Sequence, residues 1–241
     1  MGPQRQIPSS PVADPQTGLL TVTSQLVHDM NTMLSIIQGA AQLARLESGC
    51  PIAAPYVEQI LENARHLGRL TEDILSLSQL ELGNLPILLA PVSLADEVQK
   101  CCRAYKLLCS QKGLAFSVQV QAPVPERVHT DSLRLQQVFS NLLSNAVKYT
   151  AVGVVLVRVD FRNGVFRFRV DDTGCGIAPE DCERVFEPFG VAGDGATSPT
   201  RHGLGLALSR NLARLMGGDI QIVRSETGKG SSFEFTLPLS V

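Results

Sequence analysis

The chain has 241 residues, of which 44% are hydrophobic and 18% are charged, as in a soluble globular protein with a core of its own. Its 21 basic and 23 acidic residues give a formal net charge of −2, so no basic surface for nucleic acid is expected. The longest apolar stretch, 85–95, is interrupted by two prolines and is too short to span a bilayer. With no secretory signal at the start, the sequence predicts a cytoplasmic protein.

The first part of the chain is predicted to be helical. Residues 1–18 contain four prolines and are interpreted as a flexible tail or linker. Within 19–84, apolar residues recur in steps of three and four over 19–48 and again over 55–82, which predicts two helices with heptad seams and a turn at 48–55. A single hairpin would leave its apolar stripes in water. We therefore expect two hairpins to pair in a four-helix bundle, making the chain a homodimer.

The second part of the chain has mixed periodicity. Residues 85–91 break the heptad pattern and are predicted to be a hinge. Residues 92–241 mix helical and alternating patterns, which predicts an α/β sandwich with one mixed sheet and an α+β class for the whole chain. Residues 190–203 are polar, rich in glycine and without period, as in a mobile lid. Helices are expected at 94–111, 132–148 and 204–216, and strands at 114–120, 154–161, 165–170, 219–223 and 232–237.

The six cysteines are expected to be reduced, because no export signal is visible. Cys101, Cys102 and Cys109 cluster on one predicted helix. Their spacing matches no paired zinc motif, and no histidine is near them in the sequence. We therefore interpret them as buried thiols and not as a metal or redox site.

Three polar positions share one face of the predicted helix 132–148. Asn141, Asn145 and Lys148 are spaced by four and then three residues, so they lie on the same side while apolar residues face the core. Two amide oxygens can ligate magnesium, and an ammonium group beside them can meet a phosphate. Taken alone, a solvated polar face explains the pattern equally well.

Two glycine-rich segments follow along the chain. Asp172 ends a predicted strand and precedes Gly174 and Gly176, so a ligand can approach the backbone and the carboxylate can accept a hydrogen bond from an exocyclic amine. Residues 203–206 open a predicted helix and present backbone N–H groups to an anion. Each segment alone is a weak signal, since a tight turn or an ordinary helix start would look the same.

In this order, the segments resemble the ATPase superfamily that histidine kinases share with gyrase-type topoisomerases and heat-shock chaperones. The resemblance to histidine kinases covers 19–239. The family's N box is similar to 141–150, its first glycine box to 172–176, its F box to 186–189 and its second glycine box to 203–206. This resemblance implies a Bergerat-type ATP-binding fold for the second domain.

The resemblance also implies roles for individual residues. Asn145, with help from Asn141, would ligate the Mg²⁺ of bound ATP, and Asp172 would recognise the adenine amine. The lid would close over the nucleotide. The other nucleotide contacts that the resemblance implies are Lys148, Tyr149, Gly174, Gly176, Phe189, Gly203, Leu204, Gly205 and Leu206.

His28 is the predicted phosphoacceptor. It follows the seam residue Val27, which places it at the edge of the bundle, and neutral imidazole is a competent nucleophile near pH 7. A lone helical histidine is usually a surface residue, and it is the ATP-binding half of the chain that favours the acceptor role. By resemblance, Asp29 would hold the proton-bearing ring nitrogen, and Thr32 would orient water for a phosphatase reaction.

The sequence thus predicts a sensor histidine kinase core with an acceptor domain of the H-D-x-N type. It would phosphorylate itself on His28 and pass the phosphoryl group to an aspartate of a response-regulator receiver domain in two-component signal transduction. An upstream sensor domain or a sensor partner is expected to supply the signal. Two alternatives remain open: a pseudokinase scaffold without turnover, and an ATPase or serine kinase of the same superfamily whose helices serve only for dimerisation.

Overall fold

The computed structural model describes residues 85–121, 125–190 and 203–239, together with individual residues between 29 and 80. The chain divides into two compact units, Met1–Arg69 and Leu70–Val241. All described residues between 29 and 80 are helical, in agreement with the predicted helices. The predicted tail and the turn between the helices lie outside the described residues. In the part of the chain that the structure describes, no helix combines the length and apolarity of a membrane span.

The first unit buries a heptad-spaced stripe. Met33 and Ala40 are 2% and 6% exposed. The predicted seam residues Met30 and Ile37 are half-buried in the single chain. A spacing of seven residues repeats one face of a helix, as the coiled-coil pattern requires. Among the described residues of this unit, the deepest burial therefore falls beside the predicted seam, and the dimer stays a prediction.

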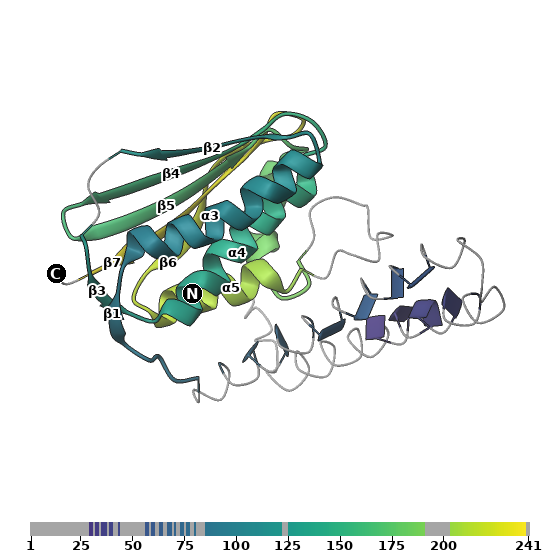
Figure 1. The fold of residues 1–241 in the computed structure, drawn as a ribbon, viewed down its shortest axis with the longest axis horizontal. Coiled ribbons are helices and arrows are strands. Elements are labelled where there is room, and N and C mark those ends of the chain that lie inside the picture. Colours follow the sequence, from purple (N-terminus) through teal and green to yellow (C-terminus); the bar gives the residue numbers. More distant parts are fainter. Residues whose placement is uncertain are drawn as a thin grey trace, which may run out of the picture. The chain divides into compact units, whose positions relative to one another are not determined.

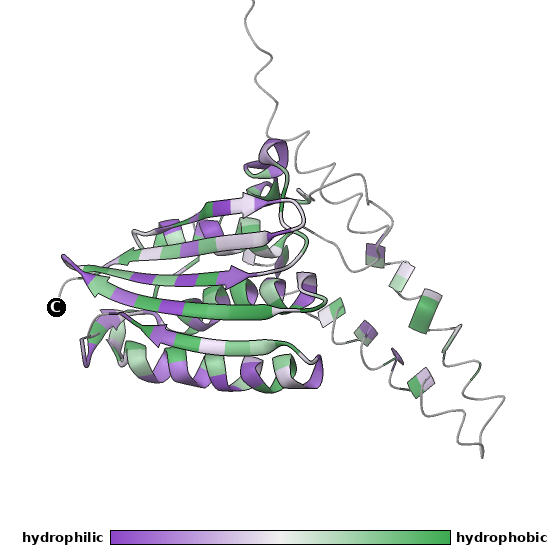
Figure 2. Cartoon of the chain, turned by 90° about the horizontal axis from the view of Figure 1, so that it is seen from above, coloured by the Kyte–Doolittle hydropathy of each residue, from purple (hydrophilic) through white to green (hydrophobic). Residues whose placement is uncertain are grey.

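The second unit is a mixed five-stranded sheet covered on one face by helices α3 (Leu94–Gln111), α4 (Ser132–Tyr149) and α5 (Gly205–Leu215) (Figure 1). One strand pair is parallel and the others are antiparallel. Hydrophobic and hydrophilic residues alternate along the strands (Figure 2), so the apolar side chains collect on one face. The predicted α+β class is confirmed. In sheet order, the strands are β2 (Ala115–Val120), β4 (Val154–Arg162), β5 (Val165–Asp172), β7 (Gly230–Pro238) and β6 (Asp219–Glu226).

Aromatic packing holds α4 against the middle of the sheet. The Phe139 ring stacks on the Phe168 ring, with centroids 4.2 Å apart. Phe166 and Phe235 each lie 6.1 Å from the Phe139 ring. All of these side chains are fully buried, so they fix which side of α4 faces the sheet. The polar side of α4 is thereby turned away from the core.

A small antiparallel sheet, formed by β1 (Ala90–Val92) and β3 (Val128–Thr130), was not predicted. Asp131 follows β3 and caps α4, with Oδ1 accepting from the Arg134 N–H at 3.1 Å. Its Oδ2 accepts from the Leu88 N–H at 2.9 Å. One carboxylate therefore holds both the start of α4 and the segment predicted as the hinge. The last residues of that segment belong to β1.

Candidate active site

Helix α4 carries the first group of predicted site residues. Asn141 and Asn145 are half-buried, Tyr149 is half-buried and Lys148 is exposed. The Lys148 ammonium lies 5.1 Å from the centre of the Tyr149 ring, a distance at which a cation is attracted to an aromatic face. The predicted division of α4 into a polar and an apolar side is confirmed. Its buried residues around this group are Leu142, Leu143, Ala146 and Val147.

Asn141 connects α4 to the start of α5. Its Nδ2 donates a hydrogen bond to the Ser209 hydroxyl at 2.9 Å. A Cβ on Gly205 would collide with Asn141 Oδ1, so α5 can begin this close to α4 only with glycine at that position. Leu204 caps α5 without a side-chain hydrogen bond. The positive end of the α5 dipole therefore lies beside an amide oxygen, which is a suitable place for a phosphate and its metal ion.

Asp172 lies at the end of β5 and is 7% exposed. Its Oδ1 accepts from the backbone N–H groups of Gly174 at 2.8 Å and Ser231 at 3.4 Å. Burial raises the pKa of Asp172 above its ordinary value; these two hydrogen bonds act against the shift, and the charge of Asp171 adds to it. No described residue donates a hydrogen bond to Oδ2. This oxygen can therefore accept one from a ligand amine.

The loop after β5 is held between α4 and the β6–β7 turn. A Cβ on Gly174 would collide with the Tyr149 carbonyl oxygen, and the Cys175 N–H donates to the same oxygen at 3.3 Å. On the other side, Gly176 lies against the backbone of Glu226. The Gly228 N–H completes the clamp by donating to the Cys175 carbonyl at 2.7 Å. Asp172 is thereby fixed relative to the end of α4.

The predicted F box forms a compact turn next to α5. Short 3₁₀ helices at Pro179–Asp181 and Arg184–Phe186 lead into it. The Arg210 guanidinium lies 4.4 Å from the Phe186 ring centre and donates to Asp219 Oδ1 at 3.1 Å. Arg210 of α5 thus connects the F box to Asp219 at the start of β6. The sequence pattern alone did not indicate this contact.

The two ends of the predicted lid meet. Phe189 is half-buried and has a positive φ of 63°. Gly203 packs against the Phe189 backbone. The segment between them, 191–202, lies outside the described residues, so the lid stays a prediction.

The structure groups the predicted site residues in three places. Asn141 meets Gly205, Tyr149 meets the loop that carries Asp172, and Phe189 meets Gly203. Leu204 is buried, whereas Leu206 packs against the core while partly exposed. The predicted acceptor His28 lies outside the described residues. Of the residues predicted to act with it, Asp29 is half-buried and Thr32 is exposed, and both are helical.

Ser209 and Ser231 also belong to this arrangement, although the sequence did not mark them as site residues. Ser209 stands four residues after Gly205, so it lies on the same face of α5, and this spacing could have marked it. Ser231 contributes only its backbone N–H to Asp172, for which no sequence signal exists.

Comparison with protein families gives two matches along the chain. Residues 19–83 match the His Kinase A (phospho-acceptor) domain. Residues 130–241 match the histidine kinase-, DNA gyrase B- and HSP90-like ATPase family. Their order agrees with the arrangement predicted from the sequence.

Comparison with individual proteins agrees with these two family matches. The chain is 34% identical to the aerobic respiration control sensor protein ArcB of Escherichia coli (strain K12), over 90% of this chain and 28% of ArcB. It is 32% identical to the autoinducer 2 sensor kinase/phosphatase LuxQ of Vibrio parahaemolyticus, over 90% of this chain and 26% of LuxQ. The crystal structure of full-length ShkA in complex with AMPPNP superposes with a TM-score of 0.69 and 30% identity, covering 92% of this chain and 46% of ShkA.

The chain therefore belongs to the histidine kinases, of which it contains the catalytic core. It spans about a quarter of the length of the curated relatives ArcB and LuxQ.

Proposed function

We propose that the chain transfers the γ-phosphoryl group of ATP to His28 and then to an aspartate of a response-regulator receiver domain. The observation that carries this proposal is the contact of Asn141 with Gly205 and Ser209, which puts an amide oxygen at the start of α5. Nucleotide phosphates fit this place because the helix end is positive and the oxygen can share a metal ion with them. The family matches supply both an acceptor domain and an ATPase domain in one chain.

Asp172 is proposed to select adenine. Its carboxylate is buried and fixed through Oδ1, which leaves Oδ2 to accept a hydrogen bond from the exocyclic amine. A guanine ring would present a carbonyl oxygen in place of that amine and would meet a buried acceptor. The similar protein ShkA binds AMPPNP, which supports ATP as the ligand here.

The donor set on α4 fits Mg²⁺. Asn145 and Asn141 are half-buried on one face and offer amide oxygens, and Mg²⁺ takes few protein ligands besides phosphates and water. When bound, Mg²⁺ neutralises charge that develops on the phosphates. Lys148 and Tyr149 would contact the nucleotide from the end of the same helix. The remaining proposed contacts are Gly174, Gly176, Phe189, Gly203, Leu204, Gly205 and Leu206.

In the proposed reaction, the unprotonated nitrogen of His28 attacks the γ-phosphorus. A P–N bond forms, the bond to the bridging oxygen breaks, and ADP leaves. Asp29 holds the N–H of the imidazole and so keeps the other nitrogen ready for attack. Thr32 is exposed one turn further along the helix, and we propose that it orients water for dephosphorylating the regulator. The kinase/phosphatase LuxQ, a relative of this chain, supports that second activity.

The assembly proposed for this reaction is a homodimer formed through the helical hairpin. The hairpin of residues 19–84 would carry the acceptor, and 92–241 would form the catalytic domain that swings about residues 85–91. An upstream sensor domain or a sensor partner would set its activity, and we propose that the reaction takes place in the cytoplasm. No nucleic acid is required at any step.

Labelling with [γ-³²P]ATP and Mg²⁺ tests the proposal. The wild-type chain is expected to take up label that is lost in acid and kept in alkali, as a phosphoramidate requires, and His28→Gln is expected to take up none. Equal labelling of both proteins would contradict His28 as the acceptor. Acid-stable label would indicate a serine kinase, and nucleotide binding without label or hydrolysis would indicate a pseudokinase scaffold.

A further inference from the structure

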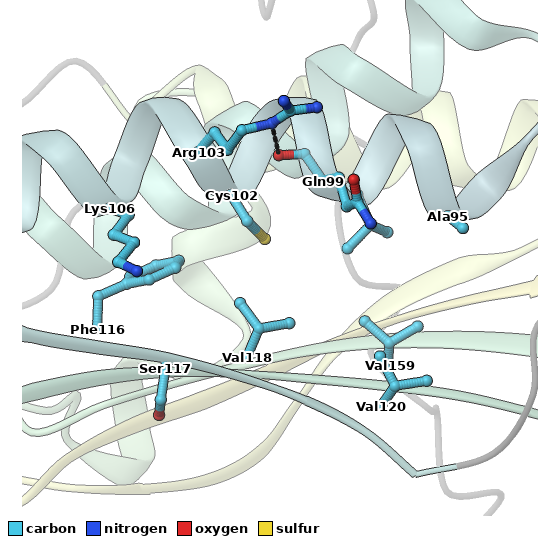
Figure 3. A pocket seen from close by; sticks show the side chains of 11 residues that line it. Ala95, Gln99, Cys102, Arg103, Lys106, Phe116, Ser117, Val118, Val120 and Val159 are labelled. Atoms are coloured by element: carbon cyan, nitrogen blue, oxygen red, sulfur yellow. Dashed lines mark hydrogen bonds between the residues drawn. The ribbon is translucent and has the colours of Figure 1, made fainter.

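A cavity of about 550 Å³ lies between helix α3 and the sheet edge formed by β2. None of the described residues that line it belongs to the candidate active site. Figure 3 shows side chains of both elements around it, with the Ser117 hydroxyl turned away. The volume falls in the range of pockets that bind small organic molecules.

The walls of the cavity are apolar. Phe116, Val118 and Val120 alternate along β2 and so share the face that is turned toward α3. Val98 and Cys102, one turn apart on α3, are 5% and 6% exposed and form the opposite wall. Val118 and Val120 nevertheless remain 42% and 64% exposed. Helix and sheet edge therefore do not close on each other here, and apolar surface is left for another group.

The rim of the cavity is cationic. Arg103 and Lys106 are exposed on the same side of α3, and none of the described residues that line the cavity carries a carboxylate. Among the described residues, neither forms an ion pair; Arg103 only donates from Nε to the Gln99 carbonyl at 3.4 Å. By contrast, Arg158 and Arg169 on the sheet are both paired with carboxylates. The terminal nitrogens of Arg103 and the ammonium of Lys106 can therefore serve an anion from outside.

We propose that this cavity binds a small amphiphilic anion, with an acyl or aromatic body between α3 and β2 and a carboxylate or sulfonate at Arg103 and Lys106. Apolar walls and a cationic rim suit a molecule with this division. Burial raises the pKa of the Cys102 thiol to about 12, to which neighbouring Cys101 adds, so this wall carries no competing charge at neutral pH. The inference does not depend on the proposed kinase activity.

Titration of the full chain with decanoate, followed by calorimetry and amide chemical shifts, tests the proposal. Decanoate is expected to bind saturably at one site. Decanol and decyltrimethylammonium, with the same chain length, should bind at least about tenfold more weakly because they lose the charge-assisted hydrogen bonds. Absence of saturable binding, or equal affinity for decanol, would overturn the proposal.

Two pairs of variants locate the site. The double variant Arg103→Gln/Lys106→Gln is expected to weaken decanoate binding about tenfold. The control Arg127→Gln/Arg224→Gln removes the same charge from exposed positions elsewhere and should leave decanoate binding unchanged. Val118→Glu puts a carboxylate into the apolar wall and should abolish binding. The matched control Gln119→Glu adds the same charge on the other face of β2 and should leave binding unchanged.

Several outcomes of these variants count against the site. Unchanged decanoate affinity in both Val118→Glu and the double glutamine variant would overturn it, as would equal losses in the control variants. If Val118→Glu alters the far-ultraviolet circular dichroism, its fold is disturbed, and the comparison of the Arg103→Gln/Lys106→Gln variant with its control becomes the deciding test. Binding to phosphatidylglycerol vesicles is the last test. If the chain binds these vesicles and decanoate does not release it, the surface recognises lipid and the proposal is overturned.

Discussion

The Asn141 side chain donates a hydrogen bond to the Ser209 hydroxyl over 2.9 Å and so links the polar face of α4 to α5. With Nδ2 engaged in this bond, Oδ1 faces Gly205 at the helix start. The orientation of one amide thus determines whether an oxygen or a nitrogen meets the proposed metal ion and phosphates. Ser209 is a positioning residue in this arrangement.

Replacing Ser209 by alanine is expected to weaken binding of Mg²⁺-nucleotide about fivefold, since loss of one hydrogen bond costs about 1 kcal/mol and frees the Asn141 amide to rotate. Nucleotide binding measured in EDTA should change less, because the metal ion no longer distinguishes oxygen from nitrogen. Ser117→Ala, on an exposed strand edge, is the control. A loss of equal size with and without Mg²⁺ would argue against orientation of the amide.

Gly205→Ala tests the close approach of α4 and α5. The added methyl group meets the Asn141 side chain, so we expect a loss of stability of about 1–3 kcal/mol in urea unfolding and weaker nucleotide binding. Gly68 offers a matched control, because it is helical and exposed and a Cβ there meets nothing within 4 Å. Gly68→Ala should be neutral or stabilise by about 0.5–1 kcal/mol. Equal effects of both changes would contradict the contact.

Asp172 makes stability depend on pH. Because burial raises its pKa in the folded chain above the ordinary value of 3.8, its contribution is favourable at low pH and is lost as pH rises through the folded-state pKa. An asparagine side chain cannot ionise, so Asp172→Asn does not lose this stability as the pH rises. The variant is therefore expected to melt higher than the wild type at pH 7, with the difference shrinking toward pH 3, while its affinity for ATP falls. A wild type whose stability relative to the variant increases with pH would contradict the direction of the shift.

Cysteine labelling reports on the loop beside Asp172. Among the cysteines that the structure describes, Cys175 is exposed, whereas burial raises the pKa of Cys101, Cys102 and Cys109. Since the thiolate is the reactive form, N-ethylmaleimide at neutral pH should modify Cys175 well before the thiols of α3. Saturating ATP and Mg²⁺ should slow this reaction. Peptide mapping by mass spectrometry measures it, and labelling of Cys102 before Cys175 would contradict the described burial.

Much of the second unit follows from periodicity. Helix α3 has the predicted bounds, 94–111, and α4 extends only one residue beyond the predicted 132–148. Long amphipathic segments carry this information because burial repeats with the period of the helix. The small sheet of β1 and β3 could not be predicted in this way, since each strand has 3 residues and pairs with a distant partner.

The sequence predicted residues of the candidate site but not which of them contact one another. Spacing put Asn141 and Asn145 on one face of α4, yet nothing in the sequence states that Asn141 meets Gly205 and Ser209 across 60 or more intervening residues. Likewise, the glycines after Asp172 indicated a close backbone approach without naming the Tyr149 carbonyl. Such contacts depend on how helices cross the sheet, which local patterns do not encode.

One measurement tests the central claim most directly: mass-spectrometric mapping of the chain during a time course with ATP and Mg²⁺, with samples kept alkaline to preserve phosphoramidates. The account predicts phosphate on His28 that rises with time and is absent from Asp172→Asn. Phosphate on a serine or threonine, or no phosphate on a chain that binds ATP, would contradict it.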